Sequence, residues 1–141
     1  MGVIEGNQLV SGNTWEQIKQ GGEPAIKRWI NTQMAGKSVV IVCIGPKTSQ
    51  RKYVKYEIEK GWKDRKGVLG IHIHNLKNLL GEQALKGSNP FASFTVNGTN
   101  LSSIAKTYDP PYTTSTYVYE HINDNLAEWV EEAIMIRKRY G

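Results

Sequence analysis

The sequence has a single cysteine, Cys43, so it cannot form a disulfide within the chain. It also has no apolar stretch close to the ~20 residues that a membrane-spanning helix needs. Its first residues lack the basic region and long apolar core of a signal peptide. We therefore expect a cytoplasmic protein without a membrane segment, in which Cys43 is a small core residue and not a nucleophile.

Two chemical motifs are also missing. The loop at residues 45–51 lacks the Gly-x-x-x-x-Gly-Lys-Ser/Thr pattern of a phosphate loop. His72 and His74 stand two residues apart on one face of an expected strand, which can suit a metal ion, but the sequence places no third ligand near them. We therefore predict no bound metal and no cofactor.

The net charge is +5 at pH 7, and this excess fits either simple solubility or attraction to an anionic ligand such as a nucleotide. The basic residues gather in three groups, at residues 47–55, 60–66 and 137–139. The last group closes an expected helix, where cations stabilise the helix dipole, and we interpret it as structural.

The six apolar residues Val39 to Ile44, followed at once by Gly45-Pro46, predict a strand that is buried on both faces. Such strands belong to parallel sheets covered by helices, and these sheets bind ligands beyond the carboxyl ends of their strands. The loop after this strand is short, basic and rich in hydroxyl groups, which suits either a phosphate or an ordinary turn.

Apolar spacing predicts helices on either side of this strand. A helix from Pro24 carries Trp29 on a buried stripe and stops at Gly36. A second helix starts near Arg51, and a strand covers residues 68–74. A long closing helix runs to about Arg139. At 141 residues the chain has the length of one domain.

Glu57 is the candidate catalytic residue. In the second helix, Val54, Ile58 and Trp62 form the buried stripe, and Glu57 lies about 60° from Val54. A carboxylate at that edge can be partly desolvated, which raises its pKa. The spacing alone also fits a surface glutamate paired with a lysine.

The remaining segments are less regular. We expect an irregular arm at residues 1–13, a helix cap at Asn13-Thr14, and a loop-rich insertion at residues 75–112 that carries a tight hairpin at Asn97-Gly98. Together with the helices and strands these form one domain, 1–141.

Several motifs resemble the TIR-like domains of bacterial antiphage Thoeris systems, and the likeness covers most of residues 15–135. The motifs are Ile44-Gly45, Thr48, Arg51-Lys52-Tyr53-Val54, Tyr56-Glu57-Ile58, the segment Gly67 to His72, the turn Gly87 to Phe91, and Tyr117-Val118-Tyr119. The resemblance implies a flavodoxin-like α/β fold, a three-layer parallel sheet with helices on both faces. Members of this family usually begin with a further strand, which we do not find ahead of Trp15.

The resemblance also implies an activity. Family members break the nicotinamide–ribose bond of NAD, and Thoeris members form a cyclic ADP-ribose signal that activates a separate effector protein. The family's catalytic glutamate falls on Glu57, and we expect Thr48, Ser49, Tyr53 and His74 to line the NAD pocket. A missing first strand would leave an open sheet edge, so we expect self-association.

Two alternatives stay open from the sequence. The chain could be a non-catalytic TIR-like module that acts by assembly or nucleotide sensing. The basic groups interleaved with aromatic residues, as at Arg51 to Tyr53, would suit a nucleic-acid binder, but no known binding module appears.

Overall fold

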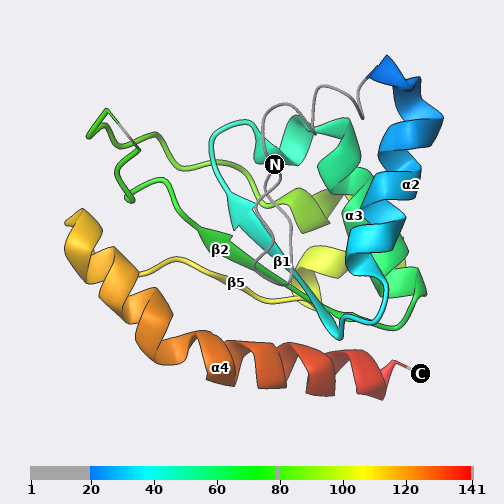
Figure 1. The fold of residues 1–141 in the computed structure, drawn as a ribbon. Coiled ribbons are helices and arrows are strands. Elements are labelled where there is room, and N and C mark those ends of the chain that lie inside the picture. Colours follow the sequence, from blue (N-terminus) through cyan, green and yellow to red (C-terminus); the bar gives the residue numbers. More distant parts are fainter. Residues whose placement is uncertain (1–19, 79, 141) are drawn as a thin grey trace.

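The computed structural model describes residues 20–78 and 80–140, and a parallel sheet runs through the middle of them (Figure 1). Its strands are β1 (Val39–Ile44), β2 (Gly67–His72) and β5 (Thr107–Tyr108), in the order β1-β2-β5. β1 and β2 pair along their whole length, from Val39 opposite Gly67 to Ile44 opposite His72. Their carboxyl ends therefore meet at one edge of the sheet.

Helices cover both faces of the sheet. Helices α2 (Gly22–Met34) and α3 (Lys52–Lys63) lie on one side, and the long helix α4 (Ser115–Arg139) crosses the other, as Figure 1 shows. The predicted fold class, a flavodoxin-like α/β arrangement with helices on both faces, is confirmed. Among the described helices, none is both long and apolar enough to cross a membrane.

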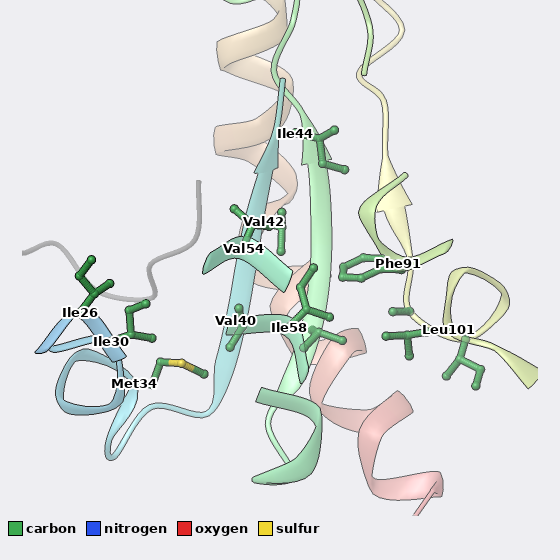
Figure 2. Close-up of a cluster of buried hydrophobic side chains, with 13 residues drawn as sticks. Ile26, Ile30, Met34, Val40, Val42, Ile44, Val54, Ile58, Phe91 and Leu101 are labelled. Carbon is green, nitrogen blue, oxygen red and sulfur yellow. The ribbon is translucent and has the colours of Figure 1, made fainter. Parts of the chain in front are cut away.

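The alternation of side chains along β1 and β2 creates two separate cores. On the α2 and α3 side, Val40 and Val42 pack with Ile30, Val54, Ile58 and Phe91. Figure 2 shows the α2 residues at one end of this layer, Phe91 and Leu101 at the other, and the α3 residues between them. On the α4 side, Leu69 and Ile71 pack against Trp129 and Ala133. The strands are thus apolar on both faces because both faces are covered.

Several turns have the conformation that the sequence predicts. Gly36 has a φ of 75°, in the left-handed region, and follows the end of α2 as predicted. Asn97 and Gly98 have φ values of 49° and 81°, the two positive angles that a type I′ turn requires. They join β3 (Thr95–Val96) to β4 (Thr99–Asn100) in the predicted hairpin. Trp29 is partly buried against the core, also as predicted.

Other predictions need correction. The second strand ends at His72, not His74. The loop-rich segment 75–112 contains β5, which joins the main sheet, together with the short helices η2 (Pro90–Ser93) and η3 (Leu101–Ser103). Cys43 is only half-buried, because its strand lies at the border of the described sheet and α4 packs mainly on β2.

The predictions for the N-terminal segment remain untested. The irregular arm at residues 1–13 and the cap at Asn13-Thr14 lie outside the described residues. Within residues 20–78 and 80–140, no strand precedes β1, so the absence of a first strand stays a prediction.

Candidate functional site

Helix α3 turns Glu57 toward the sheet. The buried residues of this helix are Val54, Glu57, Ile58 and Gly61. Gly61 lets the helix approach β1 closely, because a Cβ atom at this position would lie 2.8 Å from Cγ2 of Val40. Glu57 stands one turn before Gly61 on the same face, and its residue is only 4% exposed. A carboxyl group is therefore held inside the layer between α3 and the sheet.

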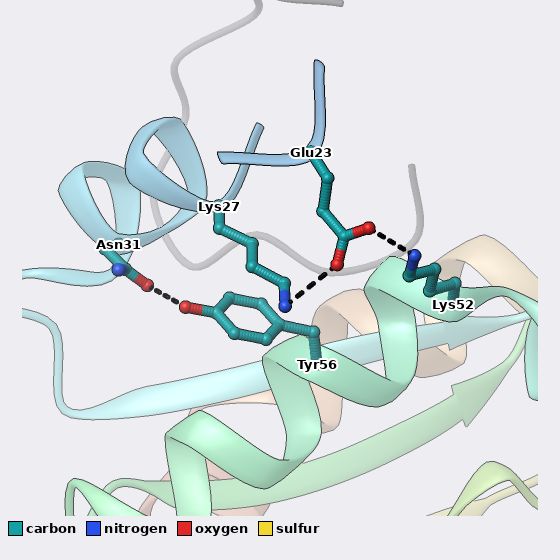
Figure 3. A network of polar contacts seen from close by, with 5 residues as sticks. All are labelled: Glu23, Lys27, Asn31, Lys52 and Tyr56. Carbon is teal, nitrogen blue, oxygen red and sulfur yellow. Dashed lines mark hydrogen bonds and ion pairs between the residues drawn. The ribbon is translucent and has the colours of Figure 1, made fainter. Parts of the chain in front are cut away.

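A polar network on the outer side of α3 fixes this orientation (Figure 3). Glu23 of α2 forms ion pairs with Lys27 at 3.0 Å and with Lys52 of α3 at 2.5 Å. The hydroxyl group of Tyr56 donates a hydrogen bond to Oδ1 of Asn31 at 2.7 Å. Because Tyr56 is tied to α2, helix α3 cannot turn about its axis to bring Glu57 to the surface without breaking this contact.

The surroundings of Glu57 favour its neutral form. No side-chain hydrogen bond or ion pair joins Glu57 to another residue of the described segments. Burial raises the pKa of Glu57 to about 8, because the charged form loses its hydration. The alternative of a surface glutamate paired with a lysine is therefore wrong. Perturbed carboxyl groups of this kind are frequent at catalytic and binding sites.

The predicted pocket residues Thr48, Ser49 and Tyr53 belong to the segment that leads from β1 into α3. Thr48 and Ser49 lie in the short helix η1 (Thr48–Gln50), and Tyr53 lies one turn before Glu57. The Thr48 hydroxyl is buried and accepts a hydrogen bond from the Gly45 amide at 2.8 Å. Thr48 thus shapes the turn at the end of β1, whereas Ser49 and Tyr53 are partly exposed beside it.

His74 follows β2 at the same edge of the sheet, because the amide of Ile73 still donates to the carbonyl of Ile44 at 3.0 Å. His74 is half-buried, and its Nδ1 has no hydrogen-bond partner among the described residues. The structure therefore brings His74 to the carboxyl edge that also carries Thr48 and Ser49.

Two residues that were not predicted to line the pocket also lie at this edge. His72 is 6% exposed, and burial lowers its pKa. It shares a face of β2 with Gly70, where an added Cβ would meet Ile44 and Phe91, so it lies on the same side of the sheet as α3. Gly87 is the other: a Cβ atom here would lie 2.0 Å from the Gly45 carbonyl oxygen. The alternation of β2 and the Gly-Ser-Asn-Pro turn were the signals for them.

Two shallow depressions are lined by described side chains, and Glu57 lines neither. The smaller, of about 180 Å³, lies along Tyr56, Lys60 and Lys63 on the outer side of α3. The larger, of about 240 Å³, lies at the start of α4. Within residues 20–78 and 80–140, no group of three or more His, Cys, Asp or Glu side chains is arranged to hold a metal ion.

Comparison with known proteins identifies the family. Residues 4–78 match the family of the Thoeris protein ThsB, TIR-like domain, and this match includes β1, α3 and β2. The chain is also 38% identical over 93 residues to a Bacillus cereus (strain MSX-D12) protein named "Putative cyclic ADP-D-ribose synthase ThsB1". That alignment covers 63% of this chain and 48% of the relative, so the chain spans about half the length of the relative. The chain belongs to the family of ThsB TIR-like domains from Thoeris systems.

Proposed function

We propose that the chain is an NAD-consuming enzyme that cleaves the bond between nicotinamide and ribose and releases an ADP-ribose product, linear or cyclic. The observation that carries this proposal is the buried carboxyl group of Glu57, which has no ion-pair partner among the described residues, inside the segment that matches the family. The name of the 38% identical relative, "Putative cyclic ADP-D-ribose synthase ThsB1", supports the same substrate.

The chemistry suits a single carboxylate. Nicotinamide leaves as a neutral ring from a cationic substrate, so its departure does not require a general acid. Positive charge develops on the ribose carbon, as in the oxocarbenium-like state of glycoside cleavage. A fixed carboxylate near that carbon stabilises the charge where it appears. A cyclic product would further require that water is excluded and that a nucleophile within the substrate is held close.

The burial of Glu57 has a consequence for this chemistry. With a pKa of about 8, the carboxyl group is mostly protonated at neutral pH in the free protein. A cationic nicotinamide–ribose group bound beside it would favour the ionised form, because an opposite charge lowers the pKa of a carboxyl group. Substrate binding would therefore generate the carboxylate that the reaction needs.

We assign supporting roles to the neighbouring residues. Tyr53 would form a wall of the pocket one turn from Glu57, and Ser49 and His74 would contact the substrate from the carboxyl edge of the sheet. Thr48 would hold the turn that positions them. The proposal also includes action in the cytoplasm, self-association of the chain, and a separate effector protein that responds to the product in antiphage defence.

The decisive experiment incubates the purified protein with NAD and resolves the products by mass spectrometry. We expect release of nicotinamide together with ADP-ribose or its cyclic form. Glu57→Gln should reduce kcat by at least ~100-fold, because charge stabilisation in the transition state is lost. The control is Glu59→Gln, an exposed glutamate of the same helix, which should keep its activity.

A pH profile sharpens this test. Since the reaction uses the ionised form of Glu57, kcat/KM should rise with pH, reach half its maximum near the free protein's pKa of about 8, and level off above it. Turnover that survives in Glu57→Gln would refute the assignment of the residue. Absence of NAD turnover in the wild-type protein would favour a non-catalytic assembly or nucleotide-sensing module.

A further inference from the structure

A second site lies on α4, on the other face of the sheet from α3. The depression of about 240 Å³ at the start of this helix is lined by Tyr112, Tyr117, Glu120, His121 and Asp124. The ring centroid of Tyr112 lies 6.0 Å from that of Tyr117 and 5.7 Å from that of His121. Tyr112 is 43% exposed and Tyr117 is 55% exposed, so these aromatic faces are open to solvent.

The charge of this region is opposite to that of the chain. The protein carries a net charge of +5, yet residues 107–136 contain no Lys or Arg and six acidic residues, Asp109, Glu120, Asp124, Glu128, Glu131 and Glu132. Asp109 pairs with Lys86, and Glu132 pairs with Lys106. Within the described segments no ion pair involves Glu120 or Asp124, the two carboxylates at the depression.

Aromatic faces next to unpaired carboxylates form a binding site for an organic cation. A cation over an aromatic ring is attracted by the negative face of the ring, and the attraction grows when carboxylates flank it. A guanidinium group fits better than an ammonium group, because its plane can stack on tyrosine while its N–H groups reach a carboxylate. The lining contains no basic side chain that would compete for these positions, His121 apart.

The size of the depression decides between a free ligand and a protein partner. Ordinary small-molecule sites enclose ~300–1,000 Å³ and bury most of the ligand. This depression is smaller and shallow, so it would accept one group and leave the rest of the ligand outside. A single group binds more tightly when it is a side chain of a protein whose surrounding surface adds further contacts. Tyrosine and arginine are among the residues most enriched at the centres of protein interfaces.

We propose that the depression between residues 112 and 124 binds an arginine side chain of a separate partner protein. The site differs from the segment matched by the family, which ends at residue 78. It also does not involve Glu57, so it can fail or succeed independently of the proposed NAD chemistry.

The test is a titration of the isotope-labelled protein, followed by NMR, with a short neutral-ended peptide that contains one arginine. The matched probe is the same peptide with citrulline, which keeps the shape of the side chain and removes its charge. We expect saturable shifts of the amide signals of Tyr112, Tyr117 and His121 with the arginine peptide and at least five-fold weaker binding of the citrulline peptide. Equal binding of both peptides, or no binding of either, would overturn the proposal.

Variants separate the site from the general acidity of α4. Asp124→Asn should weaken binding of the arginine peptide at least five-fold. Tyr112→Ala should do the same, and its amide spectrum should remain that of a folded protein. Glu131→Gln removes an exposed acid of the same helix outside the depression and should change binding less than two-fold. If Glu131→Gln weakens binding as much as Asp124→Asn, the attraction is unspecific and the proposal is wrong.

Sedimentation of the protein alone distinguishes the source of the arginine. We expect Asp124→Asn to leave the oligomeric state unchanged, because the occupant is another protein. If the wild-type chain associates and Asp124→Asn dissociates it, the occupant is a second copy of this chain, and the proposal of a separate partner is overturned.

Discussion

Glu57 on α3 and Glu132 on α4 lie on opposite faces of the same sheet. They differ in exposure, in ion pairing and in the direction in which their pKa is shifted. Glu57 is 4% exposed and has no ion-pair partner among the described residues. Glu132 pairs with Lys106 and accepts a hydrogen bond from the hydroxyl of Tyr108 at 3.0 Å. Burial raises the pKa of Glu57, whereas Lys106 lowers the pKa of Glu132.

The comparison shows how the same side chain serves two purposes. Glu132 links α4 to the residues at β5, and the ammonium group of Lys106 balances its charge. Among the described residues no lysine or arginine pairs with Glu57, although α3 carries lysines at positions 52, 55, 60 and 63. Such a carboxyl group costs stability when it ionises, and proteins retain groups of this kind chiefly at functional sites.

The largest expected effect concerns the stability of Glu57→Gln. Because the pKa of Glu57 is higher in the folded than in the unfolded protein, its contribution to stability is complete below about pH 4.5 and is lost as the pH rises toward 8. Glu57→Gln has no group that ionises at this position, so it does not lose this stability as the pH rises. By pH 9 its free energy of unfolding should exceed that of the wild type by roughly 3–5 kcal/mol, as measured by urea denaturation.

Two controls accompany this prediction. At pH 4 the wild type and Glu57→Gln should have nearly equal free energies of unfolding, since both side chains are neutral there. Glu59→Gln should show no comparable dependence on pH, because Glu59 is exposed. Equal stability of wild type and Glu57→Gln at pH 9 would mean that Glu57 is not buried as described.

The second prediction compares how closely each helix approaches the sheet. A Cβ atom at Gly67 would lie 2.8 Å from the backbone of Ala133 in α4, so the helix itself would have to move. At Gly61 the nearest atom is a methyl group of Val40, and alanine also favours the helix by ~1 kcal/mol. Gly67→Ala should therefore destabilise by about 1–3 kcal/mol. Gly61→Ala should cost less, and thermal unfolding measures both.

The third prediction concerns Arg137, the contact between the two helices. Its Nε donates a hydrogen bond to the Trp62 carbonyl at 3.0 Å, and its guanidinium group lies 4.4 Å from the centre of the Trp62 ring. The carbonyl belongs to the last turn of α3, where a cation is favourable. Arg137→Ala should cost about 1–2 kcal/mol in urea denaturation. Arg139→Ala should have almost no effect, because Arg139 is exposed.

The fold could be predicted where the sequence pattern follows one period. The apolar run of β1, the stripe of α3 and the Asn97-Gly98 turn each depend on neighbouring residues, and the structure confirms them. β5 could not be predicted in this way, because its two residues join the sheet through pairing with β2, far away in the sequence. The spacing of α3 could place Glu57 only at the edge of its buried stripe, and its fuller burial accompanies the close approach of α3 to the sheet at Gly61.

The candidate site depended more on the resemblance than on the pattern. The family resemblance selected Glu57, whereas the helix spacing alone also fitted a surface glutamate paired with a lysine. His74 was preferred to His72 as a pocket residue because a strand pattern alone does not say which of two neighbouring histidines becomes buried. The Gly-Ser-Asn-Pro turn indicated that Gly87 lies in a turn, but its contact with Gly45 joins residues 42 positions apart and could not be predicted from neighbouring residues.

The smallest expected effect, and the one that completes the comparison, is that of Glu132→Gln. The pair with Lys106 is well exposed, so the loss should not exceed ~1 kcal/mol at pH 7. Because the pKa of Glu132 is lowered in the folded protein, its contribution is present above the unfolded value and disappears as the pH falls through the folded one. The stability of Glu132→Gln should therefore approach that of the wild type in acid, whereas the stability of Glu57→Gln should depart from it in base.

High salt should reduce the effect of Glu132→Gln on stability, since salt screens exposed ion pairs, and should leave the effect of Glu57→Gln in place. Urea denaturation at two pH values and two salt concentrations checks both signs, and a salt-sensitive Glu57→Gln effect would contradict the assignment of its cause to burial.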